Sequence, residues 1–159
     1  MKLIESKVEI IEQQPGLDGV YKQIELAGRT CYKSEDKITE DSAKEFVDRM
    51  IKSKHGAMLE HGTVYLKITY PLSNTLSKEE FEKYYDEPRL EYLLGNALWD
   101  DKYTKTRHVD DDAHKTIYIT TNLRVLCSDR YKFLPWHDFV VEPTEHHIKR
   151  ITAKFTCDR

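Results

Sequence analysis

Apolar residues recur along the chain with two different periods, and each period predicts a different kind of element. Between residues 39 and 56 the spacing is helical, and one face collects Ala43, Phe46, Val47, Met50 and Ile51. Thr39 can cap the start of this helix, two acidic residues follow it, and Gly56 can end it. A second helix is predicted from about Leu17, directly after a Pro-Gly break.

Four aliphatic segments, most of them alternating with polar residues, predict strands: 2–11, 63–70, 116–126 and 149–157. In the last segment we expect Ile151, Ala153, Phe155 and Cys157 to face inward, with Arg150, Thr152 and Lys154 outward. A sheet with one buried face and one solvent-exposed face is typically antiparallel. The predicted fold class is therefore α+β, an antiparallel sheet with flanking helices.

The region between the second and third predicted strands has a different pattern. A capping box begins at Ser77, Pro88 interrupts the helical spacing that follows, and the spacing resumes up to Leu98. We expect a helical insertion at about 72–114, with the acidic triplet at 110–112 in a solvated loop. The length of the chain favours a single domain over residues 1–159, which contains this insertion.

Composition narrows the function classes. The 159 residues carry 25 Lys and Arg against 28 Asp and Glu, a net charge of -3. A dedicated nucleic-acid binder usually has a basic surplus, so that class is disfavoured. The apolar share is 39%, below the usual share of roughly 45–50%. We therefore expect a globular domain that is incomplete.

Targeting and redox signals are sparse. The chain has no stretch of roughly 20 apolar residues, so we expect no membrane span. Its first residues alternate charge with aliphatics, unlike a signal peptide. Cys31, Cys127 and Cys157 form no CxxC pair and are expected to be free thiols of a cytoplasmic protein.

Few side chains form a chemical pattern on their own. His55 and His61 flank a short turn without zinc-ligand spacing, and neither GxxxxGKS nor GxGxxG occurs. We expect His146 and His147 to face solvent at a helix start capped by Thr144. Arg124 is expected on the polar face of a strand, either as a solvated charge or as a clamp for phosphate.

Several segments, taken in order, resemble the flavin-dependent thymidylate synthases. They are AGRTCYKS at 27–34, the capped helix, HGAMLEH at 55–61, TNLR at 121–124, PTE at 143–145 and KRITAKFTCDR at 149–159. The last segment resembles the strand that precedes the signature of the longer family members. The resemblance covers nearly the whole chain.

The resemblance implies a fold, an activity and a cofactor. The family converts dUMP to dTMP with methylenetetrahydrofolate, FAD and NADPH, and works as a homotetramer with FAD held where subunits meet. It uses no cysteine nucleophile. His55, Ala57 and Glu60 match the turn that lies against the flavin, and Cys31 matches a position near the same cofactor. Ala57 stands where other members have a hydroxyl residue, so a contact there would come from the backbone.

The family signature, RHRxxS, does not occur in these residues; the one Arg-His pair, at 107–108, lies beside the acidic triplet. We therefore expect an N-terminal portion of such an enzyme, with no catalytic residue of its own and inactive as residues 1–159. The alternative is a non-catalytic module for oligomerisation or partner binding, with the apolar strand at 151–157 pairing with another chain.

Overall fold

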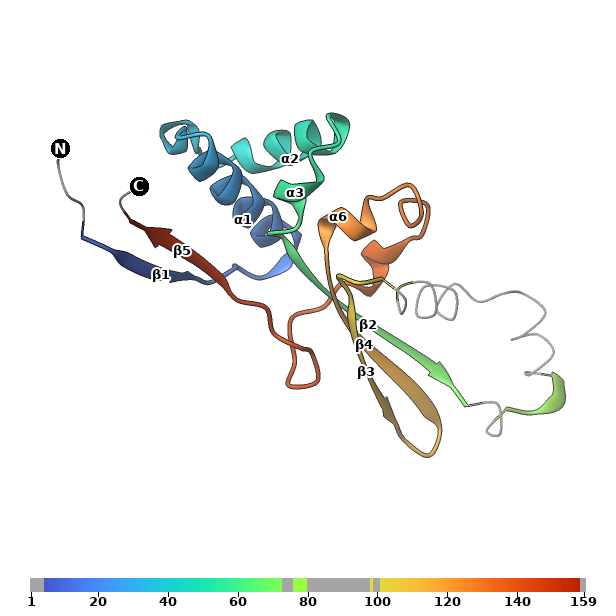
Figure 1. Ribbon diagram of the computed structural model, residues 1–159. Coiled ribbons are helices and arrows are strands. Elements are labelled where there is room, and N and C mark those ends of the chain that lie inside the picture. Colours follow the sequence, from blue (N-terminus) through green and yellow to red (C-terminus); the bar gives the residue numbers. More distant parts are fainter. Residues whose placement is uncertain (1–4, 73–75, 80–97, 99–100, 158–159) are drawn as a thin grey trace.

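A computed structural model of the chain describes residues 5–72, 76–79, 98 and 101–157. It is a mixed α/β structure with antiparallel sheets and flanking helices, which confirms the predicted class (Figure 1). The described elements run in the order β1 (Lys7–Ile11), α1 (Gly16–Cys31), η1 (Glu35–Lys37), α2 (Ser42–Lys52), α3 (Gly56–Leu59), β2 (Thr63–Pro71), β3 (Lys105–Asp110), β4 (His114–Asn122), α6 (Leu123–Leu126), η3 (Trp136–Phe139) and β5 (Thr152–Thr156).

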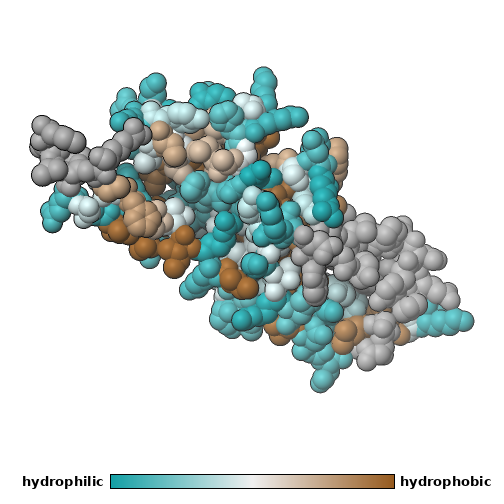
Figure 2. Space-filling view, viewed as in Figure 1, coloured by the Kyte–Doolittle hydropathy of each residue, from teal (hydrophilic) through white to brown (hydrophobic). Residues whose placement is uncertain are grey.

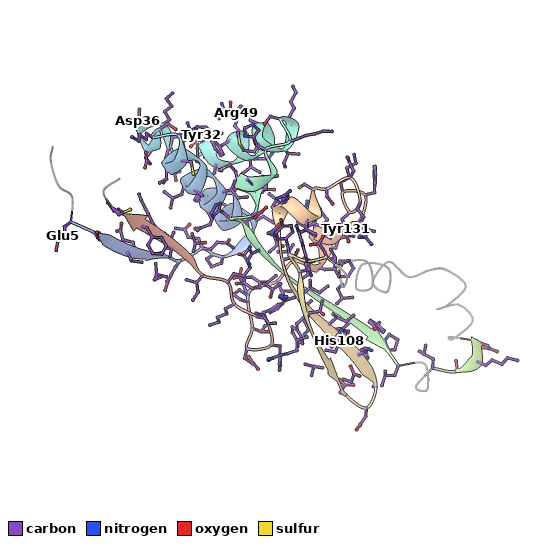
Figure 3. All side chains as sticks on the ribbon, in the orientation of Figure 1. Glu5, Tyr32, Asp36, Arg49, His108 and Tyr131 are labelled. Carbon is purple, nitrogen blue, oxygen red and sulfur yellow. The ribbon has the colours of Figure 1, made fainter. Side chains whose placement is uncertain are left out.

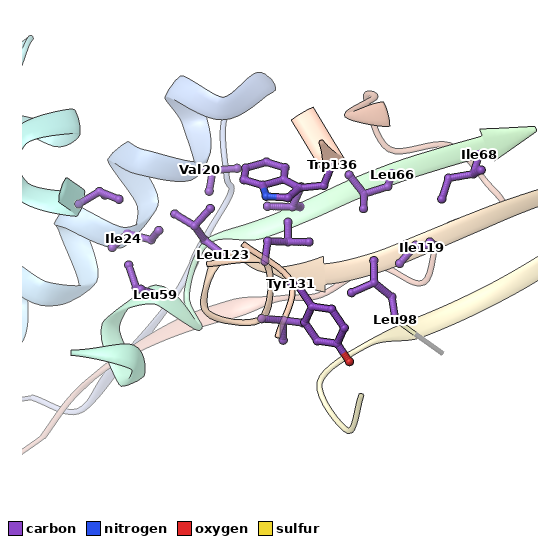
Figure 4. Packing of buried hydrophobic residues seen from close by; sticks show 14 of the residues in the cluster. Val20, Ile24, Leu59, Leu66, Ile68, Leu98, Ile119, Leu123, Tyr131 and Trp136 are labelled. Atoms are coloured by element: carbon purple, nitrogen blue, oxygen red, sulfur yellow. The ribbon is translucent and has the colours of Figure 1, made fainter. Parts of the chain in front are cut away.

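One sheet has the strand order β2-β4-β3 and is antiparallel throughout. Its alternation follows the prediction, because the inward positions of β2 and β4 are aliphatic and almost inaccessible to solvent: Val64, Leu66, Ile68, Ile117 and Ile119. Leu66 lies opposite Ile119 in the register. These side chains form one core cluster with the buried residues of α1, α2 and the segment after α6 (Figure 4).

Helix α1 packs close to the start of β2. A Cβ built on Gly62 would lie 2.5 Å from Ile24 Cδ1 and 2.7 Å from Val20 Cγ1. A similar approach joins α1 to α2, where a Cβ on Gly28 would lie 2.5 Å from the ring of Phe46. Both positions therefore need glycine, because van der Waals contact leaves no room for a methyl group.

A buried carboxylate also joins α1 to α2. Glu25 is 1% exposed, and its oxygens accept hydrogen bonds from Arg29 Nε at 3.0 Å and from Ser42 Oγ at 2.9 Å. The Arg29 guanidinium lies 5.1 Å from the centre of the Phe46 ring. The charge is thus paired and hydrogen-bonded, as burial requires.

Both ends of α2 differ from the prediction. The helix begins at Ser42, not after Thr39, because Ser42 Oγ bonds the backbone of Thr39 and closes a turn before the helix. It ends at Lys52, and Lys54, not Gly56, adopts the left-handed conformation, with φ 57°.

Two further boundaries correct the expected elements. Strand β4 stops at Asn122, whose Oδ1 accepts a hydrogen bond from Val125 N at 3.1 Å and caps α6. Arg124 is therefore on a helix and not on a strand. Within the expected helical insertion, Lys105–Asp110 forms β3 and pairs with β4, so that part of the prediction was wrong. Residues 80–97, where most of its helix was predicted, lie outside the described residues.

Strands β1 and β5 form a separate two-stranded ribbon, with Val8 opposite Phe155 and Ile10 opposite Ala153. The predicted orientation of β5 was wrong, because its apolar side chains point outward. Val8, Ile10, Ala153 and Phe155, together with Ile151, form what we call the apolar ribbon face. Val8, Ile10, Ile151 and Phe155 are 59%, 60%, 76% and 71% exposed. Figure 2 shows this face as a hydrophobic band along the ribbon.

Candidate functional site

The turn that resembles the flavin-contacting segment connects α2 to β2. Its backbone is fixed at the start, where His55 N donates to Met50 O at 2.9 Å, and it is anchored by Leu59, which is buried. His55 and Ala57 are exposed on the other side of α3. The turn is thus a surface feature anchored on the core, with exposed side chains at His55 and Ala57.

Glu60, at the end of this turn, is held by a residue far away in the sequence. Its carboxylate pairs with the guanidinium of Arg124 on α6. The guanidinium also lies 5.4 Å from the centre of the Tyr103 ring. The hydrogen bond to Glu60 raises the pKa of Arg124 above its usual value, so the guanidinium keeps its charge.

Gly56 makes this pair possible. A Cβ at that position would lie 2.9 Å from Arg124 Nε, which is closer than a side chain tolerates. The first residue of α3 and the arginine of α6 therefore pack against each other. The sequence pattern missed this arrangement, since it placed Arg124 on a strand.

A cleft of about 260 Å³ lies beside Glu60. It is lined by Glu60, His61, Thr63, Arg150, Ile151, Thr152 and Ala153. It therefore combines an acceptor, Glu60, with a cation, Arg150, and the imidazole ring of His61. Such a set can bind a polar group that has both donors and acceptors.

A larger cleft, of about 490 Å³, shares Thr63, Arg150, Ile151 and Thr152 with the first. Its other walls come from the β1–α1 connection, the start of β2 and residues 140–143. Gln13 lines this cleft, and its side-chain amide pairs with the backbone of Thr63 as the backbone of a neighbouring strand would. Gln13 donates from Nε2 to Thr63 O and accepts at Oε1 from Thr63 N, both at 2.8 Å.

The predicted site residues do not all come together. Of Cys31, His55, Ala57 and Glu60, only Glu60 lines either cleft in the described part of the chain. Cys31 ends α1 and is exposed. Figure 3 shows its neighbour Tyr32 at that end of the helix, beside Asp36.

The described residues include three cysteines and several side chains of the types that bind metal ions. Cys31, Cys127 and Cys157 are free, as predicted, and burial raises the pKa of the Cys127 thiol, which disfavours its thiolate. Within residues 5–72, 76–79, 98 and 101–157, no group of three His, Cys, Asp or Glu side chains could hold a metal ion. None of the described helices has the length and apolar character needed to cross a membrane.

The cleft beside Glu60 does not match the needs of a whole dinucleotide cofactor. It is smaller than typical ligand pockets of roughly 300–1,000 Å³. A diphosphate requires several converging donors, and Arg150 is the one Lys or Arg among this cleft's lining residues. By itself the cleft can therefore contact only part of a ligand of that size.

The prediction for the histidine pair was half wrong. Residues 145–147 form a turn and not a helix, and His147 is 5% exposed rather than solvent-facing. Thr144 does bond the turn, since its hydroxyl accepts from His146 N at 3.3 Å. Sequence spacing did not reveal that the ring of His147 bonds Leu66, 81 positions away.

The comparisons with known proteins leave this chain without a family assignment. No protein-family model matches the chain. No curated protein and no solved structure matches it either.

Proposed function

We propose that this chain is the N-terminal part of a flavin-dependent thymidylate synthase and forms one wall of its FAD site. The observation that carries the proposal is the position of Glu60. Its segment resembles the family's flavin-contacting turn, and its carboxylate, oriented by Arg124, lines a cleft that also contains Arg150.

In this proposal each residue has a limited role. Glu60 accepts a hydrogen bond from the cofactor, Ala57 offers its backbone, and His55 borders the exposed side of the turn. Cys31 is the weakest member of the predicted set, because it lines neither cleft. Bound FAD would supply the redox chemistry, while the chain's own residues bind and orient the ring.

The chain alone is expected to be catalytically inactive. Binding dUMP and a flavin diphosphate needs several converging cations and backbone donors, and the RHRxxS signature does not occur in the 159 residues. We expect no release of the C5 hydrogen from labelled dUMP with methylenetetrahydrofolate, FAD and NADPH present. Release at a rate proportional to chain concentration would contradict this.

Flavin contact is tested by NMR titration of the 159-residue chain with FAD. We expect shifts of the amide signals of residues 55–61, and loss of those shifts in Glu60→Ala. Asp129→Asn is the matched control, because it also breaks an exposed ion pair, with Lys132 at 2.6 Å, but lines neither cleft. Absence of shifts at 55–61 in the wild-type chain would refute the flavin wall.

A second candidate function is a non-catalytic module for oligomerisation or partner binding. The observation that favours it is the apolar ribbon face, since large exposed apolar patches mark interaction surfaces. Reading the gene beyond position 159 distinguishes the two, since a stop codon there supports the module and a continuing frame that encodes RHRxxS supports the enzyme. Self-association of the chain that is abolished by Phe155→Ser would show that the ribbon face is an interface under either candidate.

A further inference from the structure

One face of the three-stranded sheet carries cations on both of its outer strands. In the register, Lys67 of β2 and Arg107 of β3 each lie directly opposite Tyr118 of the middle strand β4. The three side chains therefore project from the same face, in one line across the sheet, which we call the cationic row. Lys105, two residues before Arg107, lies on this face beside the row. All three cations are exposed.

The turn that contains His146 packs on this row and adds an imidazole to it. The ring of His146 lies on the Tyr118 ring, with centroids 4.7 Å apart, and its side chain is 34% exposed. Lys67 Nζ lies 5.8 Å from the centre of the Tyr118 ring. From β3, Arg107 donates to Glu145 O at 3.4 Å, next to His146. Donors from two strands and a turn therefore converge around a single tyrosine.

Among the residues that the structure describes, Lys67, Lys105 and Arg107 have no carboxylate partner, since the ion pairs there involve other cations. The acid beside the row is Glu145, whose carboxylate is 85% exposed and lies 3.5 Å from His146 Nε2. The chain as a whole has a net charge of -3. The row is therefore a local positive surface on an acidic protein, and such a surface attracts anions.

We propose that Lys67, Arg107 and His146 form a binding site for the diphosphate group of a small ligand. None of the three lines either cleft, so this site is separate from the turn at 55–61 and does not depend on the proposed flavin wall.

The chemistry of the donors selects phosphate. The guanidinium of Arg107 can bind two oxygens of one phosphate, Lys67 adds a point charge, and the imidazole of His146 has a ring N–H to donate. Adjacent strands lie about 4.8 Å apart, so the backbones that carry Lys67 and Arg107 are about 10 Å apart. A diphosphate is longer than a single phosphate and can contact both cations without drawing them together.

The size of the positive surface favours a small ligand over a nucleic acid. On the side of the row away from Lys105, the next line across the sheet consists of Thr69, Thr116 and Val109, which carry no charge. A nucleic-acid strand presents a phosphate at every nucleotide and gains affinity from each one that is neutralised. The row provides cations for one or two phosphates only.

NMR titration of the full chain tests the site, with pyrophosphate as the probe and sodium chloride adjusted to keep the ionic strength constant. We expect saturable shifts at the amides of Lys67, Arg107, Tyr118 and His146, with weaker binding of inorganic phosphate and no saturable binding of acetate. Shifts that stay linear with pyrophosphate concentration, or equal responses to pyrophosphate and acetate, would show unspecific ion binding and overturn the proposal.

Charge variants separate the site from the overall charge of the chain. Lys67→Gln and Arg107→Gln should each weaken pyrophosphate binding by about threefold to tenfold. Lys52→Gln is the matched control, because it removes an exposed lysine from α2, outside the row. Glu145→Gln removes the acid beside the row and should tighten binding. Equal weakening in Lys52→Gln, or unchanged binding in both row variants, would contradict the site.

A short single-stranded oligothymidylate separates the two sources of phosphate. A site for a small ligand should bind it no more tightly than pyrophosphate. Tighter binding, with shifts that extend beyond the row, would assign the face to nucleic acid and overturn the proposal. The wild-type titrations decide these outcomes even if a variant does not fold.

Discussion

The three-stranded sheet and the β1–β5 ribbon are built from strands of similar apolar content, but only the sheet buries its apolar face. In the sheet, Leu66 and Ile119 lie in the core beneath α1 and η3. In the ribbon, the equivalent positions Val8 and Phe155 are 59% and 71% exposed. The two regions therefore differ in what packs against them.

The neighbours of the ribbon explain its orientation. Its other face carries Glu9, Ile11 and Lys154, which are partly covered, and Lys154 Nζ lies 4.0 Å from Glu35 of η1. A polar residue thus faces the helical layer while apolar residues face solvent. Alternation fixes the period of a strand, but a neighbouring element decides which face is buried.

The largest effect should come from the sheet. Leu66→Ala removes a fully buried side chain opposite Ile119 and should lower the free energy of unfolding by about 2–5 kcal/mol. Urea denaturation followed by circular dichroism measures this. Phe155→Ala is the matched change in the ribbon, and an equal loss there would erase the distinction between the two regions.

A smaller loss is expected where the sheet meets α1. Gly62→Ala places a methyl group 2.5 Å from Ile24 Cδ1, and overpacking of this kind costs about 1–3 kcal/mol. The same unfolding measurement applies. Ile24→Val removes the nearest atom, so the double variant should recover part of the loss; no recovery would place the strain elsewhere.

At the junction between ribbon and sheet, Gln13→Ala removes both hydrogen bonds to the buried backbone of Thr63. We expect a loss of about 1–2 kcal/mol and faster amide exchange at Thr63. Gln14→Ala, at the exposed neighbouring position, is the control. Equal effects of the two changes would show that Gln13 contributes only as part of the loop.

The smallest effect on stability should come from the ribbon itself. Phe155→Ser should change the free energy of unfolding by no more than about 0.5 kcal/mol, while any self-association seen by sedimentation should decrease. Phe133→Ser is the control, since Phe133 is 81% exposed but lies outside the ribbon. A decrease in both variants would mean that general hydrophobicity, and not the ribbon face, drives association.

The fold was predictable where local signals act alone. The start of α1 follows from the Pro15-Gly16 break and the range of β2 from its alternation, and both agree with the structure. The end of β4 had a local signal too, since Asn122 is a good N-cap residue. The alternation of apolar residues continues past it to Val125, however, so the pattern predicted a longer strand and not the start of a helix. The orientation of β5 had no local signal, because it depends on packing against distant elements.

In the candidate site, too, only the features with a local sequence signal were predictable. The turn at 55–61 was singled out by its resemblance to the family, whereas its partners in the fold had no local signal. Arg124 is 64 positions from Glu60, and Arg150 reaches the cleft from the segment before β5. His147 was missed for the same reason, because its burial depends on Tyr65 and Tyr118 from two other strands.

The amide of Gln13 has a consequence for assembly. An unpaired outer strand is a template onto which other chains can add. On β2 that side is blocked at Thr63 by Gln13 and at Leu66 by Val140. The first half of β2 is therefore protected against strand addition, and a foreign strand that reached it would first have to displace a glutamine side chain.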